Sequence, residues 1–323
     1  MERAATKVLV VGGTGYLGQH VLEGLSKIAD DGVPYDLAFT YHSTPNPPPL
    51  LLAGVPQCLA FHVDLRTGDG LETVSRRFGQ PNIVVNCAAI SVPRVCEKDP
   101  DAAMAVNVPS ALVNWISSFQ DRDALLLIHL STDQVYAGVK SFYKEEDEAA
   151  PVNVYGKSKM AAEKFISEKC SNYAILRSSI IYGPQTISPV PKSLPIQWID
   201  GVLSKGEPVE FFHDEFRCPV YVKDVVTVIL SLIHRWRSEG DKQMKLLLNL
   251  GGPNRVSRVE MAEVVAKVRG YNASLIKPVS ASSVDRGVSS PADISMDISN
   301  LVQALGIRPT PFQDGVKSTL EIA

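Results

Sequence analysis

The chain has 323 residues, of which 45% are hydrophobic and 21% are charged, and its formal net charge is −3 at pH 7. This length and apolar content predict a large core in one or two domains, and the weak negative charge provides no basic field for nucleic acid. No apolar run reaches the roughly 18 residues that span a bilayer, no secretory signal follows Met1, and the five cysteines show no metal spacing. We therefore expect a cytoplasmic protein without a metal site.

The first predicted unit is a strand, a glycine-rich turn and a helix. Residues 7–11 form a β-branched apolar run, Gly12, Gly15 and Gly18 follow, and residues 19–27 have helical periodicity. In this context the glycines allow a tight turn and a close approach to a pyrophosphate, which the helix N-terminus stabilises. The unit predicts a dinucleotide site, although G-x-G-x-x-G is the commoner spacing. An ordinary tight turn is the alternative.

Further apolar runs alternate with helix-length segments along the chain. The predicted strands are 35–41, 57–63, 83–87, 125–130, 173–177 and 245–250, and the predicted helices include 102–119, 158–169, 220–232 and 259–269. This alternation predicts an α/β fold, a Rossmann doubly wound parallel sheet. We assign residues 1–183, rejoined by about 220–251, to the Rossmann domain, and residues 184–219 and 252–323 to a smaller substrate-binding region.

The end of the second predicted strand bears on the choice of dinucleotide. An acidic residue there would bind the ribose 2′-hydroxyl and select NAD. The strand is instead followed by His42 and Ser43, which can bind a 2′-phosphate and do not repel it. NADP is therefore the expected cofactor. NAD stays open because the segment has no arginine.

Two segments carry candidate catalytic groups. Ser131 and Thr132 follow the strand 125–130, and ligands of open α/β sheets bind at the carboxyl ends of strands, so we expect both hydroxyls in one crevice. Tyr155 and Lys159 would share one face of a helix, where the ammonium would lower the pKa of the phenol toward neutrality. Such a phenol can exchange a proton with a carbonyl oxygen. A capped turn and a solvated helix face are the alternatives.

Together, Gly12-x-x-Gly15-x-x-Gly18, Asn86-Cys-Ala-Ala89, Ser131-Thr132-Asp133 and Tyr155-x-x-x-Lys159 resemble the extended short-chain dehydrogenase/reductase family. Segments 155–163, 176–183 and 290–297 are most similar to the branch of dTDP-4-dehydrorhamnose reductases and methionine adenosyltransferase regulatory β subunits. The resemblance runs from about residue 7 to 315. It implies an NADP-dependent oxidoreductase that reduces a nucleotide-linked 4-keto-6-deoxy sugar, as in dTDP-rhamnose biosynthesis.

The same resemblance implies roles for individual residues. Thr132, Tyr155 and Lys159 would form the catalytic trio with Ser131 beside them, Tyr155 being the proton donor and Lys159 also holding the nicotinamide ribose. The implied cofactor-binding residues are Gly12, Thr14, Gly15, Tyr16, Leu17, Gly18, Asp64, Leu65, Cys87, Ala88, Ala89, Asn107, Tyr155 and Lys159, to which the strand-end argument adds His42 and Ser43. Arg94, Trp198 and Arg217 are substrate candidates. Arg217 would grip a diphosphate or carboxylate, or would form a surface salt bridge.

Departures from the branch lie on the substrate side. Gln134 stands where the family has an aromatic residue, Pro93 and Arg94 interrupt an acidic stretch, and Ser290 replaces an arginine. Two alternative functions therefore stay open: a non-catalytic NADP-binding regulatory subunit of a methionine adenosyltransferase catalytic subunit, and a nucleotide-sugar epimerase. A dehydratase is disfavoured because the amide of Gln134 cannot titrate. A homodimer is compatible with the resemblance.

Overall fold

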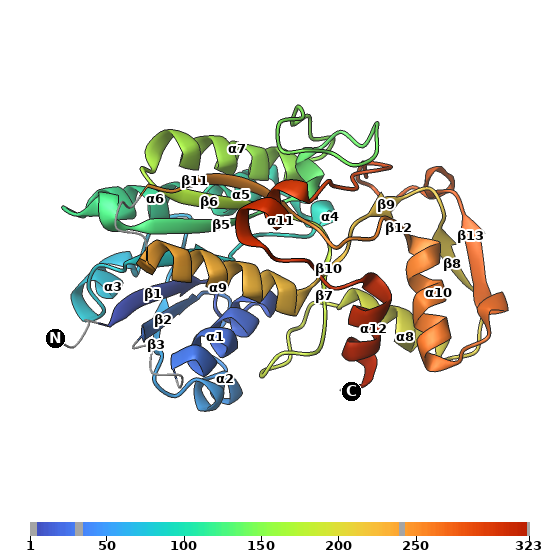
Figure 1. Cartoon of the computed structure of the whole chain (residues 1–323), viewed down its shortest axis with the longest axis horizontal. Coiled ribbons are helices and arrows are strands. Elements are labelled where there is room, and N and C mark those ends of the chain that lie inside the picture. Colours follow the sequence, from blue (N-terminus) through green and yellow to red (C-terminus); the bar gives the residue numbers. More distant parts are fainter. Residues whose placement is uncertain (1–4, 30–34, 239–242, 322–323) are drawn as a thin grey trace.

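The computed structural model describes residues 5–29, 35–238 and 243–321. The central strands are β1 (Thr6–Val11), β2 (Tyr35–Tyr41), β3 (Leu59–His62), β4 (Ile83–Asn86), β5 (Leu126–Thr132), β6 (Tyr173–Ser178) and β11 (Lys245–Leu250). They form one parallel sheet in the order β11-β6-β5-β4-β1-β2-β3 (Figure 1). Because β1 pairs with both β2 and β4, the strand order reverses at β1, where open α/β sheets bind ligands.

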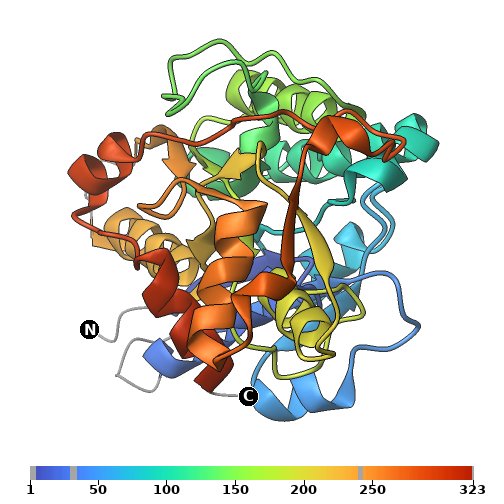
Figure 2. The same ribbon diagram turned by 90° about the vertical axis from the view of Figure 1, so that its right-hand side faces the viewer.

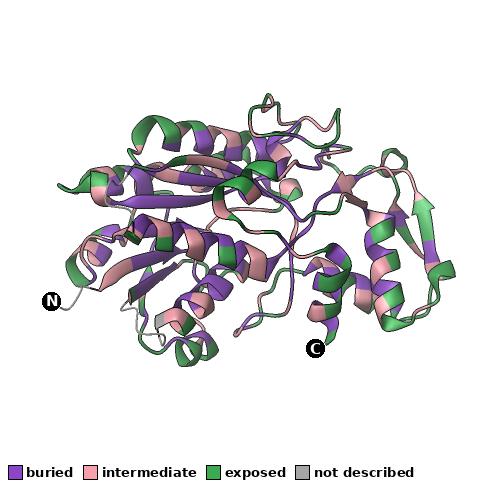
Figure 3. Cartoon of the chain, in the orientation of Figure 1, coloured by how far each residue is buried: buried purple, intermediate pink, exposed green. Residues whose placement is uncertain are grey.

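Helices cover both faces of this sheet. They are α1 (Tyr16–Ala29), α2 (Pro49–Gly54), α3 (Leu71–Arg77), α4 (Pro93–Lys98), α5 (Pro100–Asn107), α6 (Ser110–Ser117), α7 (Val154–Lys169), α9 (Val222–Ser238) and α11 (Ser299–Leu305). One core cluster joins the sheet to α1 and α9, and a second joins it to α3, α6 and α7. The strands read as continuous apolar runs because both faces are buried (Figure 3).

A smaller group of elements packs beyond the carboxyl edge of the sheet. It contains α8 (Pro195–Leu203), α10 (Arg258–Arg269), α12 (Phe312–Glu321) and the parallel pair β8 (Val209–Phe212) and β13 (Ile276–Val279) (Figure 2). A third core cluster holds these elements together. Short pairs complete the fold: β7 (Ile181–Tyr182) with β10 (Val220–Tyr221), and β9 (Phe216–Arg217) with β12 (Val256–Ser257). The described residues also form the 3₁₀ turns η1 (Arg122–Ala124), η2 (Asp133–Val135), η3 (Ala273–Leu275) and η4 (Ala281–Ser283).

The structure confirms the α/β class and each predicted strand within two residues at either end. The prediction of one helix over 102–119 is wrong, because α5 ends at Asn107 and α6 begins at Ser110. Pro109 lies between them, and its missing N–H and its ring are incompatible with a continuous helix. The predicted helix 220–232 begins instead with strand β10, and α9 then continues to Ser238. None of the described helices combines the length and apolar character needed to cross a membrane.

Candidate functional site

The glycine turn after β1 is shaped by backbone contacts that leave no room for side chains. Gly12 has φ +76°, and a Cβ there would lie 2.9 Å from the backbone of Ala88, across the point where the strand order reverses. A Cβ at Gly18 would lie 2.3 Å from the carbonyl oxygen of Gly12. Gly15 differs, because it is exposed and its Cβ would meet only the Gly12 oxygen, at 3.3 Å. Gly12 and Gly18 thus set the turn, whereas Gly15 offers an open backbone face where a pyrophosphate fits.

Neighbouring strands and a distant segment hold this turn. The Gly12 N–H donates to Thr40 Oγ1 at 3.1 Å, at the end of β2. The Tyr16 hydroxyl donates to the carbonyl oxygen of Pro184 at 3.0 Å, and Leu17 is buried in the core. Thr14 is half-buried and accepts from the Gln19 side chain through its carbonyl oxygen. These residues offer a ligand mainly their backbone.

An arginine that the sequence analysis missed lies beside the predicted 2′-phosphate segment. His42 and Ser43 are exposed after β2, and His42 Nε2 lies 3.5 Å from Asp64 Oδ2. The half-exposed Arg66 donates to the same carboxylate, with Nη2 2.5 Å from Oδ2 and Nε 3.0 Å from Oδ1. The Arg66 guanidinium holds the pKa of the Asp64 carboxyl well below its usual range. The available signal was a basic residue directly after the predicted Asp64-Leu65 pair.

Helix α7 carries Tyr155 and Lys159, and capping contacts fix its start. Asn153 Oδ1 accepts from the Gly156 N–H at 2.9 Å, and Glu97 Oε1 accepts from the Val154 N–H at 2.8 Å. Such side chains satisfy N–H groups that the first helical turn leaves without intrahelical partners. As a result Tyr155, in the first turn, is held at the carboxyl end of β5, beside the side chain of Thr132.

The expected electrostatic coupling between Tyr155 and Lys159 is wrong. Both side chains are buried, and burial raises the pKa of Tyr155, which a hydrogen bond to Thr132 only partly offsets. Lys159 Nζ instead lies 2.9 Å from His129 Nε2 in β5, and burial lowers the pKa of Lys159 to about 8. Tyr155 is therefore a phenol at neutral pH. The helical face was correctly predicted, but burial outweighs the effect of the neighbouring charge.

The prediction that Ser131 and Thr132 face one crevice is also wrong. Ser131 Oγ donates to the carboxylate of Glu163, beneath α7. That carboxylate also pairs with Arg177, whose Nη2 lies 2.8 Å from Oε2. Successive residues of a strand point to opposite faces, so only one of two adjacent hydroxyls can approach Tyr155. Ser131 belongs to a buried structural network, and Thr132 is the hydroxyl next to the phenol.

The unusual Gln134 has a structural role here. Its Oε1 accepts from Asn153 Nδ2 at 2.8 Å, so it supports the residue that caps α7. The same Nδ2 also donates to the carbonyl oxygen of Ser289 at 3.0 Å, which ties the C-terminal segment to the start of α7. Asp133 lies beside these residues, bonded to Ser179 and Thr132, and burial raises its pKa.

The residues expected along the cofactor groove divide into two kinds. Cys87 and Ala88 follow β4 directly opposite the glycine turn, with Ala89 next along the chain, and burial raises the pKa of the Cys87 thiol to about 12, so it stays protonated. Asn107 is different. Its Oδ1 accepts from the Ile90 N–H at 2.7 Å, and its Nδ2 donates to the Ile90 oxygen and to Ser158 Oγ. Its amide is thus used inside the protein, where it braces α7.

The three substrate candidates are not brought together. The terminal nitrogens of Arg217 donate to Ser290 Oγ and to the carbonyl oxygens of Phe216, Pro291 and Ala292, so this buried arginine holds the C-terminal segment. Arg94 is exposed on α4, and Trp198 is half-exposed on α8, against Phe211. The sequence analysis missed Arg258, in the first turn of α10, whose Nε lies 3.9 Å from Glu215 Oε2. Nothing local in the sequence marks Arg258.

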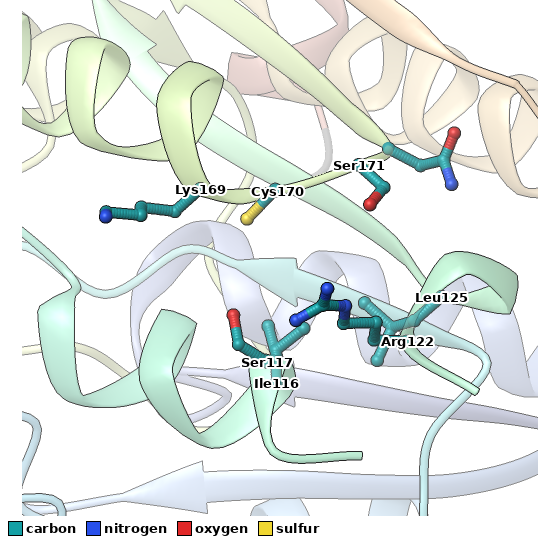
Figure 4. A pocket seen from close by; sticks show the side chains of 8 residues that line it. Ile116, Ser117, Arg122, Leu125, Lys169, Cys170 and Ser171 are labelled. Carbon is teal, nitrogen blue, oxygen red and sulfur yellow. The ribbon is translucent and has the colours of Figure 1, made fainter. Parts of the chain in front are cut away.

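Two cavities lie away from this site, near the amino ends of the strands. The one in Figure 4 measures about 10 Å³, enough for about one water molecule, and is lined by residues near the end of α7 and the start of β6. The other measures about 530 Å³ and is lined by residues at the starts of β1 and β2 and the ends of α1 and α3, among them Lys7, Ser26, Tyr35 and Phe78. Among the described residues, no cluster of three or more His, Cys, Asp or Glu side chains could hold a metal ion.

Fold and site together define a protein of the extended short-chain dehydrogenase/reductase class. The chain belongs to the RmlD substrate binding domain family, which matches residues 6–323. It is 33% identical over 242 residues to methionine adenosyltransferase 2 subunit beta of Pongo abelii, covering 75% of this chain and 70% of the relative. It is 30% identical over 243 residues to a probable low-salt glycan biosynthesis reductase of Haloferax volcanii, covering 75% and 77%.

Solved structures share the fold over almost the whole chain. A dTDP-4-dehydrorhamnose reductase from Bacillus anthracis, in complex with NADP, superposes with a TM-score of 0.77 at 21% identity, covering 99% of this chain and 100% of the other. A dTDP-glucose 4,6-dehydratase from Streptomyces venezuelae, with NAD and TYD bound, gives 0.79 at 22% identity, covering 98% and 96%. At these identities the likeness establishes the fold.

Proposed function

We propose that the protein is an NADP-dependent reductase of a nucleotide-linked 4-keto-6-deoxy sugar. The observation that carries this proposal is the buried phenol of Tyr155, which lies at the start of α7 beside Thr132, the last residue of β5. A buried phenol beside a hydroxyl is suited to donate a proton to a carbonyl oxygen. Membership of the RmlD substrate binding domain family supports the sugar class.

Each residue of the trio would have a separate task. Thr132 would hydrogen-bond the substrate carbonyl, and Tyr155 would donate its proton to the oxygen as the carbon is reduced. Lys159 would hold the nicotinamide ribose. When bound, the reduced dinucleotide supplies the hydride. General acid catalysis of this kind contributes about 10²- to 10⁴-fold to the rate.

We propose NADP as the dinucleotide because two basic side chains lie where the 2′-phosphate would bind. His42 and Arg66 are both exposed and both contact Asp64, whose charge Arg66 offsets. An arginine fork binds phosphate oxygens well. The open face at Gly15 would take the pyrophosphate. NAD stays a second possibility because Asp64 is itself acidic.

We assign the substrate to the region formed by residues 184–219 and 252–323. The half-exposed Arg258 is a better candidate than Arg217 for binding a sugar-nucleotide diphosphate, because the terminal nitrogens of Arg217 are bonded within the protein. Trp198 and Arg94 stay candidates at the exposed surface.

The deciding experiment is NADPH oxidation by the purified full-length chain against a panel of nucleotide-linked 4-keto sugars. Turnover of at least one member is expected. Tyr155→Phe keeps the ring and removes the proton, so turnover should fall by at least about 100-fold while NADPH affinity and thermal stability stay nearly unchanged. Equal turnover by this variant would disprove the role of Tyr155.

A regulatory subunit is the second candidate, because relatives at about one-third identity are named as beta subunits of methionine adenosyltransferase 2. Co-purification with a methionine adenosyltransferase catalytic subunit, together with a change in its activity, tests this function. Suppose that wild type turns over no keto sugar while Tyr155→Phe still activates the partner. The regulatory function would then replace the enzyme.

A further inference from the structure

A buried carboxylate lies one helical turn beyond Lys159. Lys159 and Glu163 are four residues apart on α7, so their side chains share one face of the helix. Lys159 Nζ lies 2.9 Å from His129 Nε2 in β5. Glu163 accepts from Ser131 Oγ in the same strand, and residues 129 and 131 point to the same side of the sheet. The ammonium and the carboxylate therefore enter the same gap between α7 and β5.

Several donors hold this carboxylate in place. Arg177 Nη2 lies 2.8 Å from Glu163 Oε2, and Arg177 Nε lies 3.1 Å from Oε1. Ser131 Oγ donates to Oε1 as well. The exposed fractions of Glu163 and Arg177 are 8% and 5%, so water does not compete for these bonds. A carboxylate held by such charge-assisted bonds has a fixed position relative to its neighbours on α7.

The other groups near Lys159 on α7, β4 and β5 are neutral. In β5, burial lowers the pKa of His129 well below its usual value, so the ring stays uncharged. After β4, burial raises the pKa of the Cys87 thiol to about 12. One turn earlier on α7, burial raises the pKa of Tyr155, which stays a phenol. Among these neighbours and Glu163, only Glu163 carries a negative charge at neutral pH.

Lys159 needs a counter-ion because it is buried. Removal from water penalises the charged form of an ammonium, and an opposite charge nearby favours it. Lys159 is only 1% exposed, and burial lowers its pKa to about 8, a shift that the Glu163 carboxylate opposes. We propose that Glu163 is a positioning residue that serves as the counter-ion of Lys159 and keeps this lysine an ammonium at neutral pH. Ser131 and Arg177 hold the carboxylate where it does so.

Arg177 shares this carboxylate without cancelling its effect on Lys159. Arg177 reaches it from β6, whereas Lys159 lies on the preceding turn of α7. Electrostatic attraction extends beyond hydrogen-bond distance and is weakly screened in a buried site. Two cations and one anion leave this group of side chains with one net positive charge. Within the proposed reductase function, on which this step rests, that charge offsets the phenolate left when Tyr155 donates its proton.

The direct test is the titration of Lys159 in the ligand-free, full-length protein, followed by ¹³C NMR of labelled lysine and assigned with Lys159→Met. Glu163→Gln removes the charge and nearly keeps the shape, so the titration midpoint should fall by at least about one pH unit. Glu168→Gln, at an exposed carboxylate of α7, is the matched control and should leave the midpoint unchanged. An unchanged midpoint in Glu163→Gln, or an equal fall in the control, would overturn the proposal. No dinucleotide or substrate is needed, so a failure of the proposed function leaves this result readable.

A second variant covers the case in which Glu163→Gln does not fold, since that change leaves Arg177 buried without its partner. Glu163→Gln combined with Arg177→Met removes both charges, which a protein tolerates better than half of a buried pair. The other bonds of Arg177 go to Tyr136 and Glu145, so its loss should affect Lys159 less than loss of the carboxylate. The Lys159 midpoint should therefore fall in the double variant as well, and an unchanged midpoint there would refute the counter-ion role.

The pH profile of turnover provides a readout that a purely structural role would not move. In Glu163→Gln the alkaline limb of kcat, where Lys159 loses its proton, should shift to lower pH by about as much as the NMR midpoint. A structural defect alone would lower kcat at every pH and leave the limb in place, and that result in an active variant would contradict the proposal. Absence of turnover by wild type would instead refute the proposed function, and the NMR titration would then decide the role of Glu163 by itself.

Discussion

The two sides of the candidate crevice are held by contacts of different range. On the cofactor side, the shape of the turn is set within one short segment, where the Gly15 N–H donates to the Gly12 oxygen at 3.0 Å and Gly18 packs on that oxygen. Contacts to Thr40 and Pro184 brace this turn from outside the segment. On the substrate side, Asn153 contacts Ser289, and Arg217 contacts Pro291, 74 residues away. A local motif therefore predicts the first side, whereas the second appears only when the chain folds.

The cofactor side of the crevice is tested most directly by Gly15→Val. A branched side chain would fill the open face at Gly15 without entering the core, because little of the protein lies near that Cβ. Calorimetry should show the loss of NADP(H) binding, by more than about 1,000-fold or about 4 kcal/mol. Gly18→Ala is the matched control. Its Cβ would overlap the Gly12 oxygen, so its main effect should be a lower free energy of unfolding. Unchanged NADP(H) binding by Gly15→Val would show that the pyrophosphate does not bind at this turn.

The next largest effect concerns the buried network beneath α7. Glu163→Gln removes the charge that pairs with Arg177 and leaves a buried guanidinium uncompensated. Breaking such a pair costs about 3 kcal/mol or more, measurable by urea unfolding. Glu168→Gln, on the same helix, removes an exposed pair with Lys164 at 3.9 Å and should change stability by less than about 0.5 kcal/mol. Equal effects of the two variants would contradict the structural role of this network.

Sequence predicted what depends on periodicity and local spacing. The parallel sheet, the glycine turn and the shared helix face of Tyr155 and Lys159 follow from such patterns. What the sequence could not predict depends on neighbours distant along the chain. In the sequence, His129 is a single polar residue inside an apolar strand. Only the pairing of β4 with β5 brings it beside Asn86. The burial that reverses the expected pKa shift of Tyr155 is likewise a property of the packed fold.

Lys159 offers a pH-dependent test of that burial. Above its folded pKa of about 8 Lys159 is neutral in the native protein, while the unfolded chain stays protonated up to a pKa of about 10.4. The unfolded state binds more protons in this window, so stability due to Lys159 rises with pH. The free energy of unfolding of wild type relative to Lys159→Met should therefore rise by about 3 kcal/mol across it. The other titrating groups are present in both proteins, so their contributions to this difference in the free energy of unfolding cancel.

A pH-independent difference between the two proteins would mean that Lys159 titrates like an exposed lysine.

The smallest expected effect lies at the 2′-phosphate segment, where the sequence analysis found His42 but not Arg66. Arg66→Ala should weaken NADP(H) binding by about 10-fold, or about 1.5 kcal/mol, because one charge-assisted contact to the phosphate is lost. NAD(H) affinity should stay unchanged, which makes it the internal control. Arg122→Ala, at an exposed residue of η1 far along the chain, controls for a general change in surface charge. If Arg66→Ala weakens both dinucleotides equally, Arg66 acts only by holding Asp64. If it strengthens NADP(H) binding, the phosphate does not lie beside it, and the cofactor side would then be defined by the glycine turn alone.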